Sequence, residues 1–202
     1  MPGQTVTCLD LGLGLNPGCD ALKKVGGIEP GVYVGQLSEL DSYTINSTTL
    51  DIESLTLITS PAGSLRWFKG KKFKNFATQE VTVGENIRTF NQGFNLVLYH
   101  FSSVEKKAIE DLVGADDVFV LAPTNAGQIE VYGIDTLGVS TNDPIGGLNC
   151  SAGSGGSGTL LNDPNSFLVT LTGEHRIISR IFNISPTATI AQNRAYLDLI
   201  TT

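Results

Sequence analysis

QEVTVGENIRTFNQGFNLVLYHFSSVEKKAIEDLVG, residues 79–114, is where the hydrophobic period of the chain changes from about two residues to about 3.6. The first part predicts an extended strand. Its apolar residues alternate onto both faces, with Phe94, Leu96 and Leu98 on one face and Val97, Tyr99 and Phe101 on the other. A strand that is apolar on both faces is buried on both, or packs one of them against a neighbouring subunit.

The second part of the stretch predicts an α-helix over about residues 102–113. Ser102 and Glu105 have the spacing of a capping box, and Gly114 is a natural C-terminal stop. Apolar residues at helical spacing give this helix one apolar side. Its charged residues are interpreted as the solvated face and not as a site; these are Glu105, Lys106, Lys107, Glu110 and Asp111.

β-Strand patterns surround this helix. Strands are predicted over 31–36 and 50–58, a hairpin over 65–76 with Gly70 near its tip, a hairpin joining 117–123 to 128–134, and a β pair formed by 166–173 and 175–182. Since the helix lies between hairpins, we expect a mainly β fold. It is an antiparallel β-sandwich or barrel with one flanking helix, long loops and terminal arms, and not a doubly wound sheet.

The predicted organisation has three parts: an N-terminal leader or arm over 1–27, a β domain over 28–184, and a C-terminal strand or arm over 185–202. The leader lacks a basic region and a long apolar run, so no signal peptide is predicted. The apolar stretches are too short for a membrane helix. Cys8, Cys19 and Cys150 are expected to stay reduced, because they match neither a zinc pattern nor an even disulfide set.

The stretch GSGGSG, residues 153–158, has the G-x-G-x-x-G spacing of a dinucleotide-binding turn. Such a turn must leave a strand and open a helix, so that the helix N-terminus meets the pyrophosphate. Here a turn and a strand follow instead. The stretch is therefore interpreted as part of a flexible surface loop over 138–158.

A basic and aromatic run precedes the long strand. Its members are Trp67, Phe68, Lys69, Lys71, Lys72, Phe73 and Lys74. They allow three interpretations: a hairpin with packed aromatic and solvated lysine side chains, a subunit interface, or a platform for single-stranded nucleic acid. The net charge of −7 disfavours the third, because nucleic-acid-binding domains are usually basic. We keep these residues as candidates for a subunit interface.

No catalytic set is visible in the sequence. The only histidines, His100 and His175, occupy ordinary strand positions without a nucleophile motif or metal spacing nearby. We therefore predict a protein that is not an enzyme, without catalytic residues, cofactor or metal.

Several pieces of sequence, in order, resemble tail-tube-like structural proteins of tailed bacteriophages that infect Bacteroidetes. They are GC at 18–19, GGI at 26–28, the strand pair around residues 73–101, the helix, the run VYGIDTLG, and SGTLLNDPNSFLVTLTGE at 157–174. The resemblance covers about three quarters of the chain, roughly residues 28–184. It implies a small β-sandwich or barrel with one helix, whose copies form rings, usually hexameric, that stack into a hollow tube for DNA passage.

The resemblance implies a virion protein of the phage tail, made in the host cytoplasm. Its partners would be its own copies and other tail or neck proteins, with transient, non-specific passage of DNA and no membrane. We expect 60–76, 138–158 and both termini to be contact segments. The alternatives are a head-tail connector, a tail terminator or a short-tail ring component. An alternative from another functional class is also kept: a β module that binds glycans or single-stranded nucleic acid.

Overall fold

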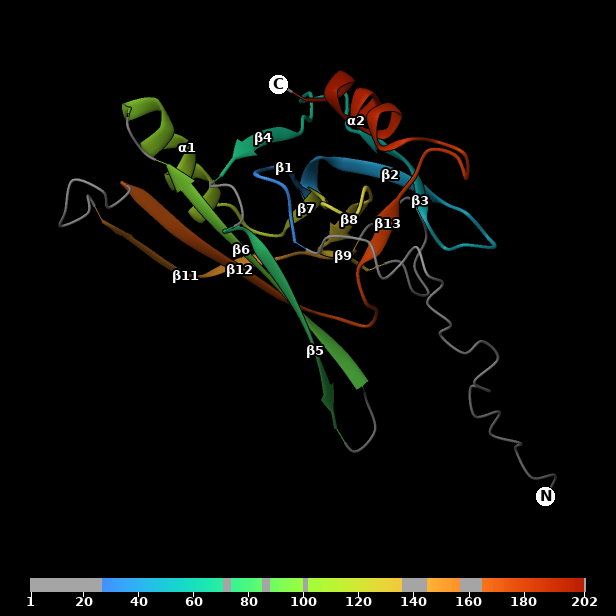
Figure 1. Cartoon of the computed structure of the whole chain (residues 1–202), viewed down its shortest axis with the longest axis horizontal. Coiled ribbons are helices and arrows are strands. Elements are labelled where there is room, and N and C mark those ends of the chain that lie inside the picture. Colours follow the sequence, from blue (N-terminus) through green and yellow to red (C-terminus); the bar gives the residue numbers. More distant parts are fainter. Residues whose placement is uncertain are drawn as a thin grey trace.

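The computed structural model describes residues 27–70, 74–84, 88–99, 102–135, 145–156 and 165–201. The fold is mainly β, as predicted, with two helices (Figure 1). In chain order the elements are β1 (Gly31–Gln36), the short 3-10 helix η2 (Leu37–Glu39), β2 (Leu40–Ile45), β3 (Ile52–Leu57), β4 (Arg66–Lys69), β5 (Phe76–Val83), β6 (Arg88–Tyr99), α1 (Ser103–Val113), β7 (Val118–Pro123), β8 (Ile129–Tyr132), β9 (Ile134–Asp135), β10 (Ile145–Gly146), β11 (Asn149–Gly156), β12 (Ser166–His175), β13 (Arg180–Phe182) and α2 (Ile190–Leu199).

A seven-stranded sheet forms the centre of the molecule, in the order β2-β3-β13-β8-β7-β1-β4. It curls into a half-barrel and is mixed, because β13 runs parallel to β3 while the other pairs are antiparallel. All six residues of β7 are buried. A strand buried on both faces must lie in a middle layer, and its apolar run VFVLAP fits that position.

The second sheet is antiparallel and four-stranded, in the order β11-β12-β6-β5. It packs against one face of the seven-stranded sheet together with α1, around a core that includes Val32, Phe94, Leu96 and Val120. A second core fills the inside of the curl, where α2 contributes the fully buried Leu197. Alternate residues of β1 and β7 therefore point into different cores.

Buried amides join the two sheets. Gln92 of β6 is 1% exposed; its side chain donates to the Ile177 carbonyl (3.0 Å) and accepts from the Gly133 amide (3.0 Å). Asn75 accepts from the Val97 amide (3.0 Å) and donates to the Pro30 carbonyl (3.1 Å). Because both side chains are satisfied, they fix the relative position of the sheets without leaving an unpaired polar group.

The helix α1 confirms the prediction for residues 102–113. The Ser102 hydroxyl accepts from the Glu105 amide, the Glu105 carboxylate accepts from the Ser102 amide, and Gly114 is the C-cap. Ile109 and Leu112 are its buried residues, and the predicted charged face is exposed. Val104 does not join the apolar side, because its side chain is 78% exposed.

The C-terminal segment forms a helix, so the predicted strand or arm over 185–202 is wrong. Thr189 caps α2 through a capping box with Gln192. Asn193 is buried and holds the helix to β13, accepting from the Ile184 amide (3.1 Å) and donating to the Phe182 carbonyl (3.5 Å). The C-terminus is thus packed onto the core.

Three further predictions need correction, while the hairpin of β7 and β8 and the pairing of β5 with β6 are confirmed. Residues 65–76 form no hairpin, because β4 pairs with β1 in one sheet and β5 pairs with β6 in the other. The strands β12 and β13 also belong to different sheets. Within the loop predicted over 138–158, β10 and β11 are strands, and residues 138–144 and 157–158 lie outside the described residues.

Candidate assembly surface

The four-stranded sheet has one face on the core and one face turned away from it. In β6, Phe94, Leu96 and Leu98 point to the core, so the intervening residues point outward. Residues directly opposite each other in the ladders share a face, which extends this assignment to the other strands. We define the outer face by the outward residues Asn149, Ala152, Ser154, Gly156, Ser166, Leu168, Thr170, Thr172, Glu174, Thr89, Asn91, Gly93, Asn95, Val97, Tyr99, Phe76, Thr78, Glu80 and Thr82.

The outer face mixes polar and apolar side chains, and the charge on its strand positions is negative only. Glu80 and Glu174 are its ionisable carboxylates, and none of its strand positions defined above is lysine or arginine. Hydrogen bonds between neighbouring strands tie its side chains together: Thr89 donates to Glu174 (2.5 Å), and Thr170 donates to Asn95 (2.8 Å). This surface offers anions no favourable charge.

Both edges of this sheet are open within the described part of the chain. The edge strands β5 and β11 each contain eight residues, and each has one paired neighbour. Edge strands are usually protected by lysine, proline or inward-pointing charge. β11 (NCSAGSGG) has no charge and no proline, and Glu80 is the one charge of β5 (FATQEVTV). Edges of this kind are available for pairing with another chain.

The glycine-rich sequence of β11 forms a strand because an aromatic ring covers it. Gly155 lies opposite Phe167, and a Cβ at Gly155 would lie 2.3 Å from Phe167 Cδ2. A Cβ at Gly153 would lie 2.9 Å from Cε1 of the same ring. The ring fills the space that side chains would occupy on the core side. The described part of GSGGSG is therefore a strand packed on Phe167, and the prediction of a flexible loop is wrong there.

The hairpin of β5 and β6 extends beyond the seven-stranded sheet (Figure 1). Val81 is 56% exposed and Val83 is 68% exposed, although both share the core-facing side with Phe90 and Arg88 of β6. No layer of described residues thus lies beneath the apolar side chains on that side. They add exposed apolar area next to the open β5 edge.

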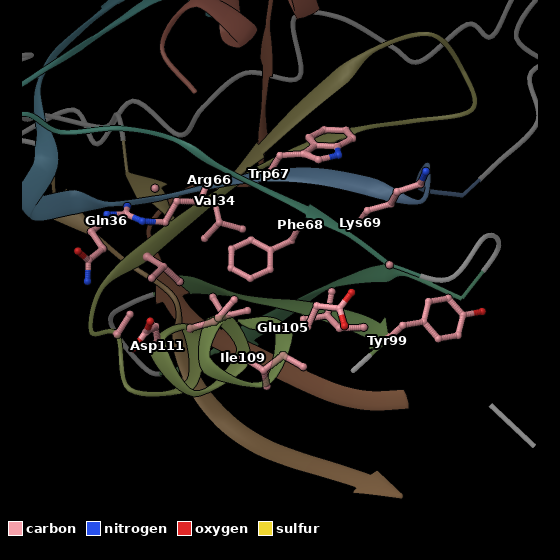
Figure 2. A pocket seen from close by; sticks show the side chains of 17 residues that line it. Val34, Gln36, Arg66, Trp67, Phe68, Lys69, Tyr99, Glu105, Ile109 and Asp111 are labelled. Atoms are coloured by element: carbon pink, nitrogen blue, oxygen red, sulfur yellow. The ribbon is translucent and has the colours of Figure 1, made fainter. Parts of the chain in front are cut away.

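The basic and aromatic run is divided between two faces of β4 (Figure 2). Phe68 points toward α1, whereas Trp67 lies on the opposite face, with its ring centroid 4.6 Å from that of Tyr33 and its indole over Gly31. Lys69 and Lys74 are exposed. Lys71, Lys72 and Phe73 lie outside the described residues. The structure therefore does not gather the described members of the run into one stacking platform.

A groove of about 700 Å³ lies between β4 and α1 (Figure 2). Its apolar wall includes Phe68, Leu98, Ile109 and Leu112, and its rim carries charged residues of both signs: Arg66, Lys69, Glu105 and Asp111. Sequence reasoning found Phe68 and Lys69 but missed the contribution of α1. The helical apolar stripe was visible in the sequence, but nothing in it showed that β4 lies opposite.

The Arg66 guanidinium at the groove rim is held by an ion pair with Glu39, with N–O distances of 2.7 and 2.8 Å. Hydrogen bonding to Arg66 lowers the pKa of Glu39, and the same hydrogen bond raises the pKa of Arg66. Since the Arg66 side chain is 45% exposed, solvent weakens this pair. The pair fixes the direction of one end of β4.

His175 is buried where β12 ends, with 2% of its surface exposed. Both ring nitrogens lack a hydrogen-bond partner among the described residues. Burial lowers the pKa of His175, and the Asp135 carboxylate opposes this in part. Asp135 itself accepts from the Arg176 side chain (2.8 Å) and amide (3.2 Å). The surroundings of His175 favour the neutral ring.

The described residues offer few features outside the sheet surfaces and the groove. They contain no group of three or more His, Cys, Asp and Glu side chains that could hold a metal ion. Neither α1 nor α2 is long and apolar enough to cross a membrane. Comparisons of the chain with protein-family models, with curated proteins and with solved structures gave no match.

Proposed function

We propose that the chain is a structural subunit of a phage virion, a tail tube protein whose copies form stacked, hexameric rings around a lumen for DNA. The observation that carries this proposal is the four-stranded sheet, whose two edge strands have equal length and no further partner among the described residues, and whose outer-face strand positions include no lysine or arginine. The resemblance of residues 28–184 to tail-tube-like proteins supplies the setting. The subunit has no catalytic role.

The edges supply the means of assembly. A strand of one copy that pairs with the edge of another satisfies backbone groups of both chains. Pairing of β5 in one copy with β11 in the next is a head-to-tail contact, which gives a ring when the rotation between copies closes. β11 suits this contact because its small side chains let another strand approach closely.

The outer face supports a role as the wall of the lumen. Duplex DNA is gripped through lysine and arginine side chains that neutralise its phosphates. A face with Glu80, Glu174 and otherwise uncharged side chains offers DNA no such contacts. DNA would then pass along it without being held, as a conduit requires.

The proposal is tested by the oligomeric form of the purified full-length protein. Light scattering during gel filtration and negative-stain electron microscopy should show rings or tubes at high concentration. A strictly monomeric species at high concentration would contradict it. Counting copies per virion by mass spectrometry then separates the roles: many copies indicate a tube, whereas one ring of copies indicates a connector or terminator.

A further inference from the structure

We propose that Trp67, on the side of β4 turned away from the groove, is a binding platform for a pyranose oligosaccharide whose ring substituents are equatorial. This inference does not depend on the proposed tail tube role. It rests on three observations: the way in which the indole is held, its exposure to solvent, and the balanced set of charged side chains next to it.

Trp67 is held firmly against the sheet while part of its ring stays open to solvent. It pairs directly with Tyr33 of β1, and the two ring centroids lie 4.6 Å apart at an interplanar angle of 59°. Its six-membered ring lies over Gly31, because a Cβ added there would be 1.8 Å from the indole Cζ2. The side chain is nevertheless 43% exposed. An aromatic ring fixed in this way loses little conformational freedom when a ligand stacks on it.

The helix α2 brings two charged side chains to this place. The Tyr33 hydroxyl donates to Oδ1 of Asp198 (2.7 Å), and Arg194 forms an ion pair with Glu29. Arg194 and Asp198 are four residues apart, so they lie on the same side of α2. The hydrogen bond from Tyr33 uses one carboxylate oxygen of Asp198 and fixes the group. The other oxygen, Oδ2, can accept from a ligand, because Asp198 is exposed.

Lys69 adds a second cation beside the indole. It is two residues from Trp67 in β4, so the two side chains share a face of the strand. Lys69 and Asp198 are exposed, and the side chains of Glu29 and Arg194 are 30% and 33% exposed. The indole therefore lies next to two carboxylates and two cations, and solvent reaches all four side chains.

This balance of charge favours a neutral ligand. A phosphate backbone would be repelled by Glu29 and Asp198, and an ammonium group would be repelled by Lys69 and Arg194. A hydroxyl group both donates and accepts hydrogen bonds, so a ligand with many hydroxyls can pair with charges of either sign. Hydrogen bonds to charged groups are also stronger than those between neutral groups. The set of side chains thus fits a polyhydroxyl compound.

A pyranose also has the apolar surface that the indole of Trp67 can bind. When its substituents are equatorial, the ring C–H groups point to the two faces of the sugar and the hydroxyls point outward around its rim. The C–H groups carry partial positive charge and are attracted to the negative face of the indole π-system. An axial hydroxyl would place a polar group against the indole instead. A stacked ring of the equatorial kind directs its hydroxyls toward the charged side chains beside Trp67.

Tryptophan fluorescence of the full-length protein tests this proposal, because Trp67 is the only tryptophan of the chain. Titration with cellotetraose or chitotetraose should shift the emission to shorter wavelength and reach saturation. The few contacts available suggest a Kd of about 1 mM. Glycerol at the same concentration of hydroxyl groups is the control and should give no saturable shift. The absence of a saturable shift with both oligosaccharides would overturn the proposal.

Two lysine variants separate the site from general effects of the sugar. Lys69→Ala should raise the Kd about three- to tenfold, because it removes a hydrogen-bond donor beside the indole. Lys106→Ala, on the exposed face of α1, is the matched control and should leave the Kd unchanged. Equal Kd values in the two variants would place the sugar elsewhere and overturn the proposal.

Substitutions of the tryptophan itself need a readout that does not use the indole. Saturation-transfer NMR of cellotetraose should show no binding to Trp67→Ala and weakened binding to Trp67→Phe, which keeps an aromatic face. Binding to Trp67→Ala as strong as to the wild type would contradict the stacking. Wild-type emission that shifts with protein concentration in the absence of sugar would mean that a second copy covers Trp67, and it would also overturn the proposal.

Discussion

At the scale of single residues, His175 makes the stability of the fold depend on pH. Its folded pKa lies below that of the unfolded chain because burial disfavours the charged ring. The neutral ring therefore makes its full contribution to the unfolding free energy above the unfolded pKa of about 6.5. As the pH drops below this value, the unfolding free energy falls by at most about 1.4 kcal/mol per pH unit. Thermal unfolding between pH 7.5 and pH 5 should show a falling midpoint.

The variant His175→Gln should remove most of this dependence, since glutamine does not titrate. A midpoint that falls as steeply in His175→Gln as in the wild type would show that other groups cause the dependence.

Gly155 tests why a glycine-rich stretch forms a strand. A Cβ at this position would lie 2.3 Å from the Phe167 ring, so Gly155→Ala forces the ring to move. We expect the variant to lose about 1–3 kcal/mol of unfolding free energy, the usual cost of overpacking. Ser154→Ala, on the outer face, is the control and should change little. In Phe167→Leu the cost of Gly155→Ala should shrink, and an unchanged cost would argue against this packing.

At the scale of elements, the open edge of β11 should be necessary for assembly and unnecessary for folding. Ala152→Lys with Ser154→Lys places charges on an edge that otherwise has none. Assembly should fall at least about tenfold at equal concentration, a loss of roughly 1.4 kcal/mol, because lysine side chains on an edge strand oppose its pairing with another strand. The unfolding free energy should change by no more than about 0.5 kcal/mol per substitution, as for other surface positions.

Ser154→Thr is the matched control for this edge, since it adds bulk without charge and should assemble. Sedimentation velocity measures the assembled fraction, and chemical denaturation measures stability. A lysine variant that assembles as the wild type does would show that β11 is not part of the contact.

Sequence predicted the elements whose signals are local. The capping box of Ser102 and Glu105 marks α1, and the turn after Pro123 marks the hairpin of β7 and β8. The second helix had the same kind of signal, because Thr189 and Gln192 have capping-box spacing. Its mixed apolar and polar composition, however, was typical of a C-terminal strand or arm. Local signals of this kind are sufficient where an element and its cap lie within a few residues.

Sequence failed where the state of a segment depends on a distant partner. β11 has the composition of a loop, and it is a strand because β12 pairs with it and Phe167 covers its glycines. β4 resembles one arm of a hairpin, but its partner β1 lies some 35 residues earlier. The open edges of the four-stranded sheet follow from these long-range pairings, so no local motif indicated them.

At the scale of the whole molecule, the distribution of charge should prevent assembled protein from holding DNA. The net charge is −7 and the outer face presents carboxylates without cations. Assembled wild-type protein should show no retention of duplex DNA in a polarisation assay. Asn91→Arg with Thr172→Arg adds two cations to the outer face and should produce binding that weakens as salt is raised.

A charge-matched control places the same two cations elsewhere. Val104→Arg with Val113→Arg puts them on exposed positions of α1, away from the outer face. Once assembled, this variant should bind duplex DNA far more weakly than the outer-face variant. Equal binding by both variants would mean that total charge, and not the outer face, governs contact with DNA.

The central claim is that copies of this chain join through the two open edges of the four-stranded sheet. Cryo-electron microscopy of the assembled full-length protein tests it most directly. The account predicts closed rings in which β5 of each subunit pairs with β11 of the next, with the outer face lining the lumen. Assemblies in which both edges stay exposed, or in which the outer face lies on the outside, would contradict it.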